Sequence, residues 1–122
     1  MNKTVTAIVV VATLVFLGGG VWFISQSNTA HTSPAKLDAF AKCLSAKKIT
    51  MYGAYWCPHC QATKKDFGNS FQYVNYVECT VDTQKCSDMN INGYPTWIFP
   101  DGTRNEGQMS LRDLSAKSDC PL

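Results

Sequence analysis

The longest apolar stretch of the chain lies at its beginning, over residues 5–24, and contains no charged side chain. As an α-helix, with a rise of about 1.5 Å per residue, this stretch would span about 30 Å, the hydrocarbon thickness of a bilayer. We therefore predict an N-terminal membrane anchor over residues 1–24. A cleaved secretory signal is the alternative, although the apolar region of such a signal is normally only about 7–15 residues long.

The charge beside the apolar stretch predicts its orientation. Lys3, on the N-terminal side, is the nearest charged residue, which favours a cytoplasmic N-terminus. Residues 25–33 are small and polar without an apolar period, as is typical of a short flexible linker. Residues 34–122 would then form one domain on the extracytoplasmic face of the cell membrane, held there by a single pass.

Within residues 34–122, amphipathic segments alternate with short β-prone segments. Ser33 as N-cap and Pro34 in the first turn begin the first helix, and Ser110 with Asp113 has the spacing of a capping box. This order predicts an α/β fold, with a small central mixed sheet flanked by helices and an antiparallel hairpin at one edge. We expect helices over residues 34–47, 58–67, 84–89 and from 110 onward, and strands over residues 49–55, 73–79, 93–99 and 103–107.

The charge of the chain argues against nucleic-acid binding. Lys and Arg total 11 and Asp and Glu total 9, which leaves a net charge of +2. Basic residues form no run longer than the pairs Lys47-Lys48 and Lys64-Lys65. A basic patch that could bind a phosphate backbone is therefore not expected.

The sequence Cys57-Pro58-His59-Cys60 is the motif whose side chains can carry out a reaction. Cys57 is placed at the N-cap of the predicted helix, where unpaired N–H groups and the helix dipole stabilise a thiolate, and a protonated His59 would add to this. Cys60 lies one turn inside the helix and should be more buried and less acidic. We therefore predict that Cys57 is the nucleophile, that Cys60 is the resolving thiol, and that Pro58 and His59 tune the redox potential.

Three other interpretations of this motif remain open at the level of sequence. A zinc knuckle would need two further ligands, and Cys79 and Cys86 do not have the spacing of a second knuckle. An inert structural bridge has no need to stand at a helix start after a strand. Copper binding by Cys57, Cys60 and His59 is the third. The redox interpretation is favoured, and it requires no cofactor and no metal.

Four further cysteines, Cys43, Cys79, Cys86 and Cys120, allow three pairings into two bridges. The simplest pairs Cys79 with Cys86 and leaves Cys43 with Cys120. Two structural disulfides suit an oxidising compartment, and the long loop closed by Cys43 and Cys120 would contribute about 4 kcal/mol in the chain-entropy model. A second redox pair that relays electrons is the alternative role.

Residues 54–60 together with Gly93-Tyr94-Pro95-Thr96 resemble the thioredoxin superfamily. The longer segments 51–61, 76–79 and 93–97 are most similar to the thioredoxin-like domain associated with bacterial homologues of vitamin K epoxide reductase, with a DsbA-like Cys-Pro-His-Cys motif. The resemblance covers residues 36–120.

This resemblance implies a thioredoxin-like fold in which a cis Pro95 faces the cysteine pair, Tyr94 contacts substrate and Trp56 lines the surface where clients bind. The Pro-His dipeptide implies an oxidising member. Where many members carry a buried acidic residue beneath the pair, this chain has Met51. Deprotonation of Cys60 must then depend on solvent, on substrate or on a group that the sequence does not identify.

These observations together predict a membrane-anchored, extracytoplasmic thiol-disulfide oxidoreductase. It would pass the Cys57–Cys60 disulfide to cysteine-containing secreted proteins and be reoxidised by a quinone-linked membrane partner resembling a vitamin K epoxide reductase homologue. A disulfide reductase or isomerase of the same compartment is the nearest alternative, because direction depends on potentials and partners. An alternative of another class is a non-catalytic thioredoxin-like module that binds peptides.

Overall fold

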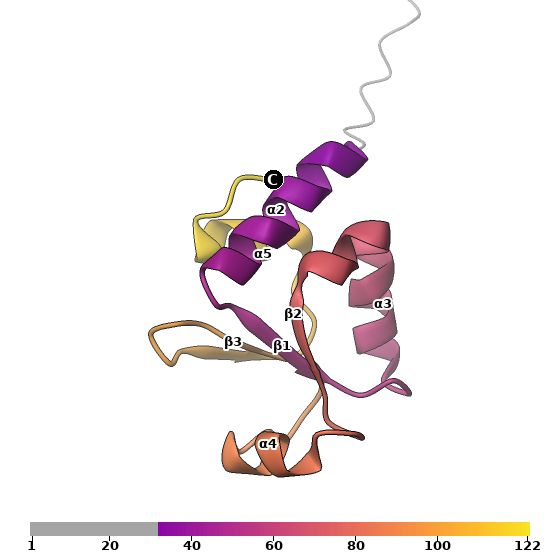
Figure 1. The fold of residues 1–122 in the computed structure, drawn as a ribbon, viewed down its shortest axis with the longest axis vertical. Coiled ribbons are helices and arrows are strands. Elements are labelled where there is room, and N and C mark those ends of the chain that lie inside the picture. Colours follow the sequence, from indigo (N-terminus) through magenta and orange to yellow (C-terminus); the bar gives the residue numbers. More distant parts are fainter. Residues whose placement is uncertain (1–31) are drawn as a thin grey trace, which may run out of the picture. The chain divides into compact units, whose positions relative to one another are not determined.

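A four-stranded mixed sheet forms the centre of residues 32–122, the part of the chain that the computed structural model describes (Figure 1). The strands are β1 (Thr50–Gly53), β2 (Asn75–Glu78), β3 (Thr96–Ile98) and β4 (Arg104–Glu106), in the spatial order β2-β1-β3-β4. β1 pairs in parallel with β2 and antiparallel with β3, and β4 pairs antiparallel with β3. The predicted mixed sheet with a hairpin edge is confirmed.

Helices surround this sheet, as predicted. They are α2 (Pro34–Ala46), α3 (Pro58–Phe67), the 3-10 helix η1 (Gly68–Tyr73), α4 (Thr83–Asp88) and α5 (Leu111–Ser118). In Figure 1, α4 lies across the sheet from α2 and α5. This arrangement of sheet and helices fits a thioredoxin-like fold.

Helix ends follow the capping residues of the sequence. Pro34 occupies the first turn of α2 after Ser33, and the Ser110 hydroxyl accepts a hydrogen bond from the Asp113 N–H at 3.1 Å to begin α5. Gly68, with a φ of 54°, ends α3, and its N–H donates to the carbonyl groups of Lys64 and Lys65. These caps place the start and end of each helix close to the predicted positions.

The strands are shorter than predicted, for two local reasons. The chain does not pass directly from Gly68 to a strand, because residues 68–73 form η1 and β2 begins only at Asn75. Pro95 has no N–H to donate to a strand neighbour, and β3 accordingly begins at Thr96 rather than at Gly93. The predicted strands over residues 73–79 and 93–99 are therefore wrong at their N-terminal ends.

The two faces of the sheet support two apolar clusters. Successive strand residues point to opposite faces, so Met51 and Tyr52 enter different clusters. The smaller cluster includes Tyr52 and Ile98 together with Cys79 and Cys86. The larger cluster includes Phe40 and Leu44 of α2, Met51 of β1, Phe67 of α3, Trp97 of β3 and Leu114 of α5.

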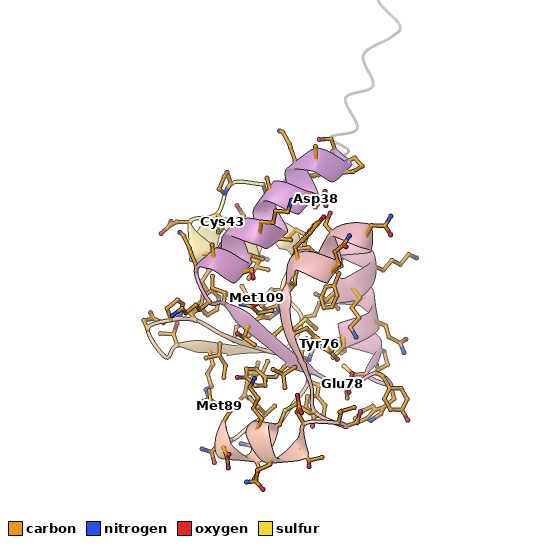
Figure 2. The ribbon with its side chains drawn as sticks, in the orientation of Figure 1. Asp38, Cys43, Tyr76, Glu78, Met89 and Met109 are labelled. Atoms are coloured by element: carbon orange, nitrogen blue, oxygen red, sulfur yellow. A yellow bond between two sulfur atoms is a disulfide. The ribbon has the colours of Figure 1, made fainter. Side chains whose placement is uncertain are left out.

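Two disulfides join segments around these clusters. Cys43 of α2 bonds to Cys120 after α5, and Cys79 at the end of β2 bonds to Cys86 of α4. Figure 2 shows Cys43 on α2. These are the two bridges of the simplest pairing.

The predicted anchor over residues 5–24 lies outside the described residues, as does nearly all of the predicted linker over residues 25–33. Within residues 32–122, every helix is too short or too polar to span a bilayer.

Candidate active site

The Cys57-Pro58-His59-Cys60 motif sits where β1 leads into α3. Cys57 is the N-cap of α3 with an extended backbone, and Pro58 occupies the first turn. The Cys57 N–H donates to the Ala54 carbonyl at 3.1 Å, and its carbonyl accepts from the Gln61 N–H at 3.0 Å. A tight turn therefore carries the chain from the strand into the helix and fixes the Cys57 side chain at the helix start.

The two motif sulfurs lie side by side. The Cys60 thiol donates to Cys57 Sγ at 2.6 Å, and the Cys60 backbone N–H donates to the same sulfur at 3.2 Å. Both cysteines are free, and they are 3% and 0% exposed, respectively. The pair can therefore close into a disulfide, of about 2.05 Å, with little movement of the backbone.

The Cys60 thiol is held in its neutral form. Burial, and after it the hydrogen bond with Cys57, raise its pKa to about 12. A hydrogen bond with the Ala54 backbone and the positive charge of Lys64 act in the opposite direction. Cys60 is therefore a fully buried, weakly acidic thiol, as expected of a resolving cysteine.

Two residues of β2 that the sequence did not single out, Tyr76 and Glu78, are labelled in Figure 2, and Tyr76 lies next to Cys60. The Tyr76 hydroxyl donates to Glu78 Oε2 at 2.7 Å. Burial and the neighbouring Glu78 raise the pKa of Tyr76. Partial burial raises the pKa of Glu78, but the hydrogen bonds from Tyr76, Thr80 and Tyr55 outweigh it and hold that pKa below its usual value. At neutral pH the pair is therefore a phenol and a carboxylate.

Because Gly53 has no side chain, Tyr76 of this pair can lie close to the Cys60 thiol. In the register of β1 and β2, Met51 faces Tyr76 and Gly53 faces Glu78. A Cβ atom on Gly53 would lie 3.0 Å from Cys60 Sγ and 3.2 Å from the Tyr76 hydroxyl oxygen. The period of two along β2 places Tyr76 and Glu78 on one face, but only the pairing with β1 brings that face to Cys60.

Pro58 and His59 are exposed at the start of α3. His59 Nδ1 lies 3.0 Å from Gln108 Oε1, so a ring with its proton on Nδ1 donates to this amide oxygen. Gln108 precedes α5 and was not among the predicted site residues. The role of Pro58 and His59 in setting the redox potential stays a prediction.

Aromatic side chains surround the reactive turn. Tyr55 and Trp56, directly before Cys57, are 67% and 57% exposed. The Trp56 ring meets the half-buried Tyr94 ring edge to face, with centroids 5.8 Å apart. The Tyr94–Pro95 peptide bond is cis, and the Pro95 ring is buried. The structure thus brings Trp56 and Tyr94 together, and substrate contact by Trp56, Tyr94 and Pro95 stays a prediction.

The other four cysteines are bonded to one another and not to the reactive pair. Cys43, Cys79, Cys86 and Cys120 are all bonded in disulfides. In residues 32–122, His, Cys, Asp and Glu side chains form no group of three or more that could hold a metal ion.

Comparison with known proteins bears on this geometry. No protein-family model matches the chain. The chain is 40% identical over 96 residues to thiol-disulfide oxidoreductase LTO1 of Arabidopsis thaliana, covering 71% of this chain and 25% of that protein. It is 34% identical over 89 residues to thioredoxin domain-containing protein 5 homolog of Drosophila melanogaster, covering 64% of this chain and 21% of that protein.

The chain thus spans a quarter or less of the length of these two relatives. Their names are consistent with an enzyme of the thiol-disulfide oxidoreductase type. Together with the four-stranded sheet and its helices, the two similarities support placing the chain in the thioredoxin-like superfamily.

Proposed function

We propose that this chain is a membrane-anchored, extracytoplasmic dithiol oxidase of secreted proteins. The observation that carries the proposal is the free Cys57–Cys60 pair at the start of α3, with sulfurs 2.6 Å apart. The other four cysteines of the chain form disulfides remote in sequence from that pair. The reactive dithiol is thus distinct from the structural bridges.

The oxidation proceeds by two exchanges of sulfur–sulfur bonds. A client thiolate attacks Cys57 Sγ of the Cys57–Cys60 disulfide, so that a client–Cys57 bond forms and Cys60 leaves as a thiolate and takes up a proton. A second client thiolate then attacks the client sulfur of this mixed disulfide and releases the Cys57 thiolate. The client gains a disulfide, and two electrons remain on the enzyme dithiol.

A membrane partner would return the dithiol to its oxidised form. We propose a quinone-linked enzyme resembling a vitamin K epoxide reductase homologue, on the basis of the resemblance of residues 36–120 to the domain associated with such enzymes. The uncharged apolar stretch over residues 5–24 supports the anchor, and Lys3 supports a cytoplasmic N-terminus. The two structural disulfides support an oxidising compartment.

Two alternatives predict different behaviour of the same site. A reductase or isomerase would run the same exchange in another direction. A non-catalytic peptide-binding module is favoured by the exposure of Tyr55 and Trp56 beside the motif.

Redox equilibration of the full chain in detergent micelles tests the proposal. The protein is equilibrated in graded glutathione buffers, alkylated, and each of its six cysteines is mapped by mass spectrometry. An oxidase or isomerase is expected to give a Cys57–Cys60 potential of about −120 to −200 mV, and a reductase a potential of about −270 mV. If Cys57 and Cys60 do not exchange with glutathione, the enzyme proposal fails and the binding module replaces it.

A further inference from the structure

The segment Tyr55–Trp56, which leads into the reactive turn, is held in place by side chains that lie outside the segment. Tyr55 and Trp56 lie between the end of β1 and the start of α3, and more than half of each side chain is exposed. Packing of the two rings therefore contributes little to holding the segment in one conformation. Its position must depend on the bonding of its backbone groups.

The backbone N–H and C=O groups of Tyr55 are both hydrogen-bonded to side chains, which come from two different elements. Glu78 Oε1, at the end of β2, accepts a hydrogen bond from the Tyr55 N–H at 3.1 Å. Gln61 Nε2, in α3, donates to the Tyr55 carbonyl at 2.8 Å. The backbone of an exposed residue is thus held on both sides, by Gln61 of the adjoining helix and by Glu78, which lies 23 residues further along the chain.

Glu78 is itself held in place by three further hydrogen bonds. Its Oε2 accepts from the Tyr76 hydroxyl at 2.7 Å, and its Oε1 accepts from the Thr80 hydroxyl at 2.7 Å and from the Thr80 N–H at 3.3 Å. Hydrogen bonds to an ionised carboxylate are stronger than those between neutral groups. The lowered pKa of Glu78 keeps the carboxylate ionised at neutral pH, so this anchor persists there.

The held segment continues into an aromatic surface next to the reactive sulfur. Trp56 contacts Tyr94 edge to face, and Tyr94 precedes the cis proline at position 95. Aromatic rings offer apolar contact area at a low cost in conformational entropy, and a surface held in place before binding avoids the cost of ordering it. Because Trp56 directly precedes Cys57 and is exposed, a polypeptide whose cysteine reacts there comes within reach of this surface.

We propose that Glu78 and Gln61 are positioning residues that hold the Tyr55–Trp56 segment as a preformed surface for client polypeptides carrying an aromatic or large apolar side chain next to the reacting cysteine. The inference rests on the proposed function and specifies its substrate class. It assigns Glu78 and Gln61 no part in the exchange of sulfur bonds, so small dithiols, which do not reach the surface, should react independently of both residues.

The experiment compares three substrates of the oxidised full chain in detergent micelles. The first is a two-cysteine peptide with phenylalanine beside one cysteine, the second is the same peptide with glycine in that position, and the third is dithiothreitol. The variants are Glu78→Ala, Glu78→Gln and Gln61→Ala. Gln72→Ala is the matched control for Gln61→Ala, because Gln72 Nε2 likewise donates to a backbone carbonyl, that of Asn69, at 2.9 Å. Asp66→Ala is the control for an exposed acidic residue.

Loss of the Glu78 anchor is expected to raise the KM for the phenylalanine peptide about tenfold, with kcat almost unchanged, because a hydrogen bond to a charged group contributes about 1.5–3 kcal/mol. Gln61→Ala is expected to raise it about fivefold, since a neutral hydrogen bond contributes about 1 kcal/mol. Glu78→Gln keeps an acceptor for the Tyr55 N–H and should recover most of the loss. The glycine peptide and dithiothreitol should react within twofold of the unmodified chain with every variant.

Different failures point to different conclusions. If Gln61→Ala and Glu78→Ala both leave the KM for the phenylalanine peptide unchanged, the inference is overturned and the proposed oxidase stands. Equal losses with dithiothreitol also overturn it, because they place the effect in the chemistry of the cysteines. If Glu78→Ala does not fold, Gln61→Ala decides by the same criteria. A wild-type chain that oxidises none of the three substrates overturns the proposed function, and this inference with it.

Discussion

At the scale of single residues, Gly53 determines how closely Cys60 and Tyr76 can pack. A Cβ atom at this position would lie 3.0 Å from Cys60 Sγ and 3.1 Å from Tyr76 Cε2, both closer than ordinary contact distances. Neither neighbour can move freely, since Cys60 is fully buried in α3 and the Tyr76 hydroxyl is bonded to Glu78. Glycine is therefore required here by space rather than by backbone conformation.

We predict that Gly53→Ala lowers the free energy of unfolding by about 1–3 kcal/mol, the usual cost of overpacking a core. It should also displace Cys60 and slow its attack on a mixed disulfide at Cys57. Urea unfolding measures the first effect. The second effect is measured by release of thionitrobenzoate from 5,5′-dithiobis(2-nitrobenzoate), in which attack by Cys57 gives the first release and attack by Cys60 on the mixed disulfide gives the second. Gly93→Ala is the control, because a Cβ there meets no atom within 4 Å; equal effects of the two substitutions would contradict the explanation.

The raised pKa of Cys60 predicts how the stability of the reduced protein depends on pH. Burial and the hydrogen bond with Cys57 place this pKa at about 12, above the value of 9.0 for a free thiol. Between these values the unfolded chain has lost the proton and the folded chain has kept it. The contribution of Cys60 to stability is therefore complete below pH 9 and is lost as the pH rises toward 12.

We expect the free energy of unfolding of the reduced chain to fall above pH 9, with a contribution from Cys60 of at most about 1.4 kcal/mol per pH unit. The Cys60→Ala variant lacks this contribution. Subtracting its urea unfolding curves from those of the reduced chain removes the effects of Lys and Tyr residues. Parallel pH profiles for the two proteins would show that Cys60 titrates at an ordinary pKa.

At the scale of the elements, sequence patterns that act locally predicted well. Ser33, Pro34 and Ser110 mark helix starts through bonds or conformations confined to a few neighbouring residues. The position of Cys57 at the start of α3 follows from the same local rules, because Pro58 favours the first turn of a helix. The position of the reactive pair could thus be predicted from the sequence, and the different roles of its two cysteines stay a prediction.

What the sequence did not reveal depends on contacts between distant segments. Glu78 can hold the Tyr55 backbone only because the parallel pairing of β1 with β2 places it opposite Gly53, and because the Tyr55 N–H then reaches its carboxylate. Nothing in the residues around Glu78 indicates that register. The 3-10 helix η1 was missed for a similar reason. Its Ser70 is buried, and the Ser70 hydroxyl donates to Asp38 Oδ1 of α2 at 2.6 Å, a partner that the local pattern cannot specify.

At the scale of the whole domain, two links connect α2 to the C-terminal end of the chain. Cys43 bonds to Cys120 across a sequence separation of 77 residues. Nearby, Lys47 Nζ donates to the Ser118 carbonyl at 2.6 Å and to the Asp119 carbonyl at 3.3 Å, at the end of α5. The Lys47 contacts can maintain the native packing of this region when the disulfide is removed. Loss of the disulfide should therefore lower the free energy of unfolding mainly by releasing the unfolded chain from a constraint.

Removing each of the two disulfides should therefore lower the free energy of unfolding by a different amount. In the chain-entropy model, the Cys43–Cys120 bridge contributes about 4.5 kcal/mol, and the Cys79–Cys86 bridge, with a separation of only 7 residues, contributes about 2.5 kcal/mol. Urea unfolding of the Cys43→Ala/Cys120→Ala and Cys79→Ala/Cys86→Ala double variants, with the Cys57–Cys60 pair kept oxidised, measures both contributions. Adding Lys47→Met to the first double variant should then lower its free energy of unfolding further, because the Lys47 contacts no longer maintain the native packing of this region. If removing the short bridge costs as much as removing the long one, loop entropy does not govern the effect, and the contacts of α4 with the sheet must account for it.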